Sequence, residues 1–72
     1  MDENKKIGIA LKSIRTAGGF TAEQSAKAIG HTSSWIFDIE SGRRNVNFRD
    51  ARALCYYYGV SVDYLSKMID KL

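Results

Sequence analysis

The chain has 72 residues, a formal net charge of +3, 44% hydrophobic residues and 26% charged residues. This length allows one domain with one modest core, and the composition is that of a globular protein rather than a disordered one. No apolar run approaches the ~20 residues that span a bilayer, and the first six residues do not lead into a secretion signal. We therefore expect a single domain over residues 1–72, working in a reducing cytoplasm without a membrane partner.

The scarcity of cysteine and histidine limits the chemistry of the chain. Cys55 alone cannot form an internal disulfide, and Cys55 with His31 cannot build a conventional zinc site. Catalysis needs a base placed beside its partner in a pocket, and the sequence shows no such constellation around His31. We expect no enzyme activity, no cofactor and no metal. We interpret His31 as a structural or solvated turn residue and Cys55 as a small core residue.

The first half of the chain predicts two helices. Apolar residues recur at i, i+4 and i+7 in the first segment, at Ile7, Leu11 and Ile14. Gly18 and Gly19 end that helix, since glycine readily adopts the left-handed conformation found there. Thr21 and Gln24 then have the spacing of a capping box, which opens a second, short helix that Gly30 ends.

The second half predicts three more helices. Thr32 is a cap for a helix from Ser33 to about Ser41, which Gly42 stops. A fourth helix spans residues 48–58 after the cap Asn47, with Asp50 favoured by the helix dipole and Gly59 as the stop. A fifth begins at residue 62 after the cap Ser61 and runs towards residue 68 or 69. The sequence therefore predicts an all-α domain.

Two short helices joined by a glycine-containing, three-residue turn form a helix-turn-helix. The chain resembles the phage repressor and Cro family over residues 11–65 without a gap. The motif residues that carry this resemblance are Phe20, Thr21, Ala26, Ile29, Gly30, Ile36, Ile39, Glu40, Ser41 and Gly42. The resemblance implies a five-helix, lambda-repressor-like bundle with its motif at about 21–41, in which Arg15 pairs with Glu40. It also implies a bacterial or phage transcriptional regulator, in our prediction a repressor, that binds double-stranded operator DNA as a homodimer.

The resemblance assigns a surface to DNA. The positions that reach base edges correspond to Thr32, Ser33, Ser34, Phe37 and Asp38. The positions that contact the DNA backbone correspond to Thr21, Trp35, Ser41, Arg43, Arg44 and Arg49. The base-contact set departs from the family, which often carries Gln, Arg, Lys or Asn there, because those side chains make bidentate contacts to bases. The arginines, with Arg52, suit phosphate contact, and a solvated basic edge is the alternative.

The functional hypotheses assign different roles to Asp38. An acid on the outward face of a recognition helix can accept a hydrogen bond from a cytosine amino group, can be held by an arginine such as Arg43, or can repel DNA. The alternative to a DNA-binding protein is an interaction module on the same scaffold, in which Trp35 and Phe37 form a docking patch for a protein partner.

The carboxyl-terminal third is rich in tyrosine. Successive residues of a helix point 100° apart, so the run 56–58 cannot be buried as a whole. Tyr58 takes a core position by resemblance, and others are exposed. We predict a dimer interface drawn from Tyr56, Tyr57, Val60, Val62, Tyr64 and Met68. The alternative is surface tyrosines packed on neighbouring side chains.

Overall fold

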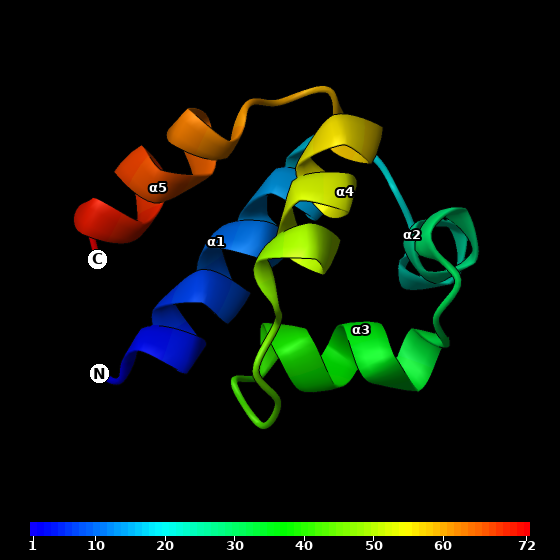
Figure 1. Cartoon of the computed structure of the whole chain (residues 1–72), viewed down its shortest axis with the longest axis horizontal. Coiled ribbons are helices and arrows are strands. Elements are labelled where there is room, and N and C mark those ends of the chain that lie inside the picture. The colour runs from blue at the N-terminus through cyan, green and yellow to red at the C-terminus, as the bar shows by residue number, and fades with distance from the viewer.

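A computed structural model describes residues 1–72 as five α-helices and no strand (Figure 1). The helices are α1 (Glu3–Ala17), α2 (Ala22–Ile29), α3 (Ser33–Glu40), α4 (Phe48–Tyr58) and α5 (Val62–Asp70). Helix α1 runs through the middle of the molecule and packs against α3 and α5, while α2 packs against α3 and α4. None of these helices combines the length and the apolar character needed to cross a membrane. The predicted all-α class and the five-helix order are confirmed.

Local capping sets the helix starts. Four caps act as predicted, each accepting a hydrogen bond from the backbone N–H three residues later: Thr21, Thr32, Asn47 and Ser61. The first helix begins one turn before its apolar repeat, because the Asp2 carboxylate accepts from the Lys5 N–H at 2.8 Å. Two predicted ends are corrected, since α3 stops one residue earlier, at Glu40, and α5 extends one or two residues further, to Asp70.

One apolar core joins all five helices. Its eleven buried residues are Ala10, Leu11, Ile14, Ala22, Ala26, Ile36, Ile39, Leu54, Cys55, Tyr58 and Leu65. Ala26 and Ile36 are both 2% exposed where α2 and α3 pack together, a position that requires a small side chain on α2. Burial raises the pKa of the Cys55 thiol, which disfavours the reactive thiolate and agrees with its interpretation as a core residue.

Helix α1 approaches α3 closely at Gly8, a feature that sequence analysis does not reveal. A Cβ atom added to Gly8 would lie 2.5 Å from the carbonyl oxygen of Glu40. The absence of a side chain at Gly8 therefore allows the carboxyl end of α3 to rest directly on α1.

A buried ion pair holds the same end of α3. The Arg15 guanidinium donates from Nε to Glu40 Oε2 at 2.6 Å and from Nη2 to Oε1 at 3.0 Å, so the contact is bidentate. Its Nη1 donates to the Phe20 carbonyl at 3.0 Å, which ties in the segment before α2. The two side chains are only 10% and 6% exposed, and the hydrogen bond with Glu40 raises the pKa of Arg15. The pair expected by resemblance is present.

Removal of this pair's acid should strongly destabilise the domain. We expect Glu40→Ala to lower the free energy of unfolding by about 3–5 kcal/mol, because it leaves the Arg15 charge buried without a partner. The control is Lys67→Ala, which breaks the exposed Lys67–Asp63 pair and should cost less than about 1 kcal/mol. Urea denaturation measures both, and equal losses would show that the buried pair has no special weight.

Candidate nucleic-acid interface

Helix α3 presents hydroxyl groups, one acid and one aromatic ring on its solvent side. Its inward residues Ile36 and Ile39 are each 2% exposed, whereas Phe37 on the outward side is 51% exposed. The five predicted base-contact residues share this outward, amino-terminal side of α3: Thr32, Ser33, Ser34, Phe37 and Asp38. Thr32 and Ser34 are exposed, and Ser33 and Asp38 are half-buried. The structure thus places these five side chains within seven consecutive residues, from the cap Thr32 to Asp38 in the second half of α3.

Arg43 holds the Asp38 side chain. Its Nε and Nη2 donate to Asp38 Oδ1 at 3.2 and 3.1 Å, and its backbone N–H donates to the Asp38 carbonyl at 3.0 Å. Both hydrogen bonds reach the same carboxylate oxygen, so Oδ2 keeps its acceptor capacity. The arginine-held alternative is therefore present in the structure, and it neutralises the only acid on the outward face of α3.

The remaining arginines of the 43–52 cluster have no carboxylate partner. Arg44 lies in the loop after α3, and Arg49 and Arg52 lie in the first two turns of α4. All three are exposed, and none takes part in an ion pair. This loop lies at one end of α3 and helix α2, which begins after Thr21, lies at the other (Figure 1). Thr21 and the arginines consequently flank α3, whereas Trp35 lies in its first turn and Ser41 is its carboxyl-terminal cap.

Comparisons with known proteins identify the family and the fold of this chain. Residues 6–67 match a helix-turn-helix domain family. The chain belongs to that family. Two crystal structures of ClgR, the clp gene regulator of Corynebacterium glutamicum, match with TM-scores of 0.96 and 0.94, each at 24% identity. The chain is covered to 99% in both matches, and it spans 76% and 91% of the two ClgR chains. At this identity the likeness shows the fold, and no curated protein sequence matches the chain.

The turn of the helix-turn-helix is anchored to α4 by a cluster that sequence analysis missed. His31 Nε2 lies 3.1 Å from Asp50 Oδ2, and the imidazole stacks on the Trp35 indole with ring centroids 3.7 Å apart and planes 4° apart. Asp50 is 8% exposed, so the hydrogen bond from His31 satisfies a buried carboxylate. His31 precedes the cap of α3, so the i, i+4 rule for residues of one helix gave no signal for its contact with Trp35. His31 is a structural residue here, as expected.

The six predicted dimer residues do not form one surface. Val60, Tyr64 and Met68 line a hollow between α5 and α1. Val62 lines a separate groove between α5 and α4. Tyr56 is 88% exposed on the outer side of α4.

Tyr57 occupies a fourth environment. It is half-buried and its ring packs against Phe20 at a centroid distance of 5.0 Å. The Phe20 ring also packs against the ring of the buried Tyr58, at a centroid distance of 5.3 Å. Tyr57 thus follows the alternative interpretation, a tyrosine packed on its neighbours, whereas Tyr56 and Tyr64 are exposed.

Substitution of His31 tests the anchor of the turn. We expect His31→Ala to lower the free energy of unfolding by about 1–3 kcal/mol, because the buried Asp50 carboxylate loses its hydrogen-bond partner. The fluorescence of Trp35, the single tryptophan, should also change as its stacking partner disappears.

The matched control is His31→Gln, which keeps an N–H donor for Asp50 and removes the aromatic ring. It should recover part of the stability while keeping the altered fluorescence. A His31→Ala protein with wild-type stability and emission would contradict this account.

Proposed function

We propose that this protein is a small transcriptional regulator, a repressor of the phage repressor and Cro type, that binds operator DNA as a homodimer. Helix α3 enters the major groove. The observation that carries the proposal is the pairing of hydroxyl groups and one acid on the solvent side of α3 with arginines that have no acidic partner, Arg44 and Arg49, directly beyond its carboxyl end.

The side chains of α3 suit short-range readout of bases. The hydroxyls of Ser33 and Ser34 both donate and accept, and they require close approach of the helix to the base edges. Phe37 supplies an apolar surface for a thymine methyl group. The free Oδ2 of Asp38 is an acceptor for a cytosine amino group, while Arg43 cancels the charge that would repel phosphates. We therefore assign base contact to this face.

The flanking residues suit the sugar-phosphate backbone. Arg44 and Arg49 contribute affinity through counterion release, and Arg43 retains Nη1 as a donor to phosphate. On the other flank and along α3, the hydroxyl of Thr21 and the indole N–H of Trp35 are the neutral donors. Ser41 becomes a donor to phosphate when it releases the hydrogen bond from its hydroxyl to the Asp38 carbonyl. Together they position α3 without carrying sequence information.

One observation bears on the alternative, a protein-docking module that uses Trp35 and Phe37. Phe37 is 51% exposed, as a docking residue would be. Trp35, however, is half-buried and stacked on His31, so the face offers one free aromatic ring rather than two. The uncompensated arginines beside it favour DNA.

Arg44 provides the test of backbone contact. We expect Arg44→Ala to weaken binding equally on different DNA duplexes and to reduce the slope of log affinity against log salt by about one, because one phosphate contact is lost. The matched control is Lys67→Ala, which removes the same charge from α5, a helix that packs on α1 and α4. Fluorescence anisotropy at several salt concentrations measures both variants. Unchanged affinity and salt slope for the Arg43→Ala/Arg44→Ala double variant would contradict the proposed contact with the DNA backbone.

Asp38→Asn separates base readout from repulsion. The substitution keeps the shape of the side chain, removes its charge and releases Arg43. If Asp38 accepts from a cytosine, we expect a loss of about 1–3 kcal/mol on a site selected from random DNA, with a small gain on unselected duplexes. A gain of the same size on every duplex would show that Asp38 only repels. Binding constants on both kinds of DNA provide the measurement.

A further inference from the structure

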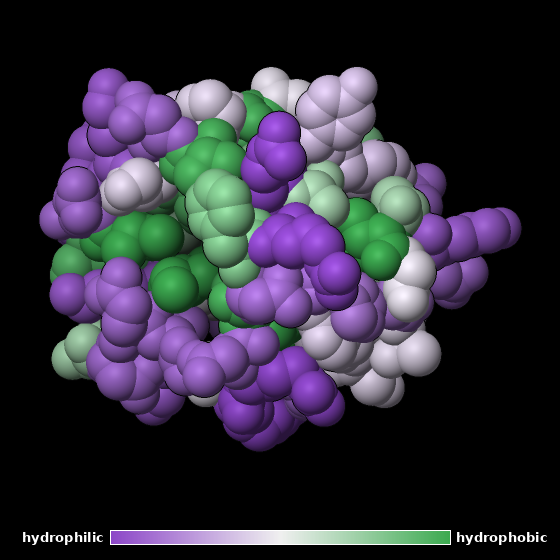
Figure 2. All heavy atoms as spheres, in the orientation of Figure 1, coloured by the Kyte–Doolittle hydropathy of each residue, from purple (hydrophilic) through white to green (hydrophobic).

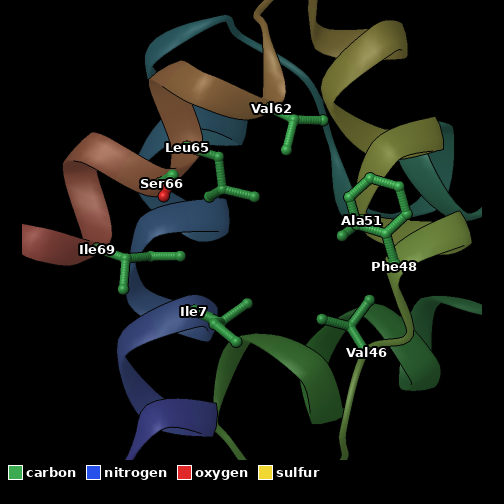
Figure 3. A pocket seen from close by; sticks show the side chains of 8 residues that line it. All are labelled: Ile7, Val46, Phe48, Ala51, Val62, Leu65, Ser66 and Ile69. Carbon is green, nitrogen blue, oxygen red and sulfur yellow. The ribbon is translucent and has the colours of Figure 1, made fainter.

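An apolar groove opens between α1, α4 and α5, away from the outward face of α3. It has a volume of about 310 Å³, and seven of its eight lining residues are apolar. Figure 3 shows the side chains of Ile7, Val46, Val62 and Leu65 directed towards a common opening, with Phe48 at its edge. In Figure 2 apolar side chains gather on the same face of the molecule and are bordered by polar ones. We propose that this groove is occupied by a second copy of the chain, and that it forms the two-fold contact of the regulator.

Phe48 makes the groove self-complementary. This side chain is the first residue of α4 and is 69% exposed, the largest exposed fraction among the three phenylalanines. An exposed aromatic ring beside an apolar hollow is what an isologous interface requires, since the same patch supplies the inserted side chain and its receptor on both subunits. Two copies related by a two-fold axis would each place Phe48 in the groove of the other. The aromatic ring and the groove are then buried together.

The charges on the two sides of the groove are also complementary. Arg52 lies one helical turn after Phe48 on α4, and Asp70 lies one turn after the groove residue Ser66 on α5. Both are exposed and neither takes part in an ion pair. A two-fold axis that runs along the groove, between α4 and α5, sets α4 of one subunit opposite α5 of its partner. Arg52 of each subunit can then meet Asp70 of the other, which favours this pairing over random contact.

The placement of α3 fits a dimer on DNA. The groove opens along the shortest axis of the molecule, whose Cα extent is 21 Å, so a partner seated on the groove lies beside the subunit along this axis. Helix α3 lies along a different edge and stays free, so both recognition helices can face the same duplex (Figure 1).

A stable interface buries about 800 Å² on each partner, which is roughly a sixth of the 4577 Å² surface of this chain. One face of the molecule can supply this area. The inference deepens the proposed function by naming the dimer surface, and it revises the predicted interface set, of which only Val62 lines this groove. The contact itself requires no DNA, so it can be tested on the protein alone.

Sedimentation equilibrium of the full chain without DNA is the experiment. We expect a concentration-dependent dimer, whose dissociation constant rises about 10- to 100-fold in Phe48→Ser, because an aromatic side chain no longer leaves water on association. The matched control is Tyr64→Ser on the opposite side of α5, where an aromatic residue that is 51% exposed is removed outside the groove. It should leave the dissociation constant unchanged. Circular dichroism confirms that each variant is folded.

A charge exchange provides the second arm. Arg52→Asp and Asp70→Arg should each weaken the dimer, and the double variant should restore it, because the pair is re-formed with reversed signs. A monomer at all concentrations, or dissociation caused by Tyr64→Ser and not by Phe48→Ser, would overturn the proposal. Loss of DNA binding in a protein that still dimerises would instead overturn the proposed function and leave the groove contact standing.

Discussion

The bidentate pair between Arg15 and Glu40 is the constraint on which the placement of α3 depends. An eight-residue helix has little apolar surface of its own, and only Ile36 and Ile39 of α3 are fully buried among its apolar side chains. These two side chains direct one side of α3 inward, but they leave small rotations about the helix axis open. A planar guanidinium bound at two carboxylate oxygens does fix it, because both distances and the plane must be kept. In this rotation Ser34 and Phe37 of α3 face solvent.

A second polar contact acts at the other end of the same helix. Glu40 is the last residue of α3, whereas His31 precedes its cap and stacks on Trp35 in the first turn. The Asp50 carboxylate therefore attaches the start of α3 to α4, while Arg15 attaches its end to α1. Each contact buries a charged group that would be costly if left alone, so the correct seating of α3 is strongly preferred over neighbouring ones. A short recognition helix held in this way can approach DNA with small side chains.

Local features of the fold could be predicted from the sequence, and distant ones could not. The caps Thr21, Thr32, Asn47 and Ser61 act within three residues, so their spacing is sufficient to place the helix starts. The contact of His31 with Asp50 spans 19 residues and depends on where α4 crosses the turn, which no periodicity reports. The same holds for Gly8, whose lack of a side chain matters only because α3 passes over it. The Arg15–Glu40 pair was expected only by resemblance, since its two halves lie 25 residues apart.

The candidate site shows the same division. The outward set on α3 follows from helical geometry once Ile36 and Ile39 are assigned to the core, so these residues could be named from the sequence. The six residues proposed for the dimer were chosen because all could not be buried, and exposure alone does not make residues neighbours. On α5, Val62 and Tyr64 are two positions apart, which on a helix directs them to nearly opposite sides. An exposed apolar residue indicates an interface when a matching apolar groove lies beside it. Phe48 meets this condition, because α1, α4 and α5 leave such a groove next to it. The three-dimensional arrangement therefore distinguishes Phe48, which lies beside a groove that a partner can fill, from exposed aromatic residues that have no such groove. Composition alone cannot make this distinction.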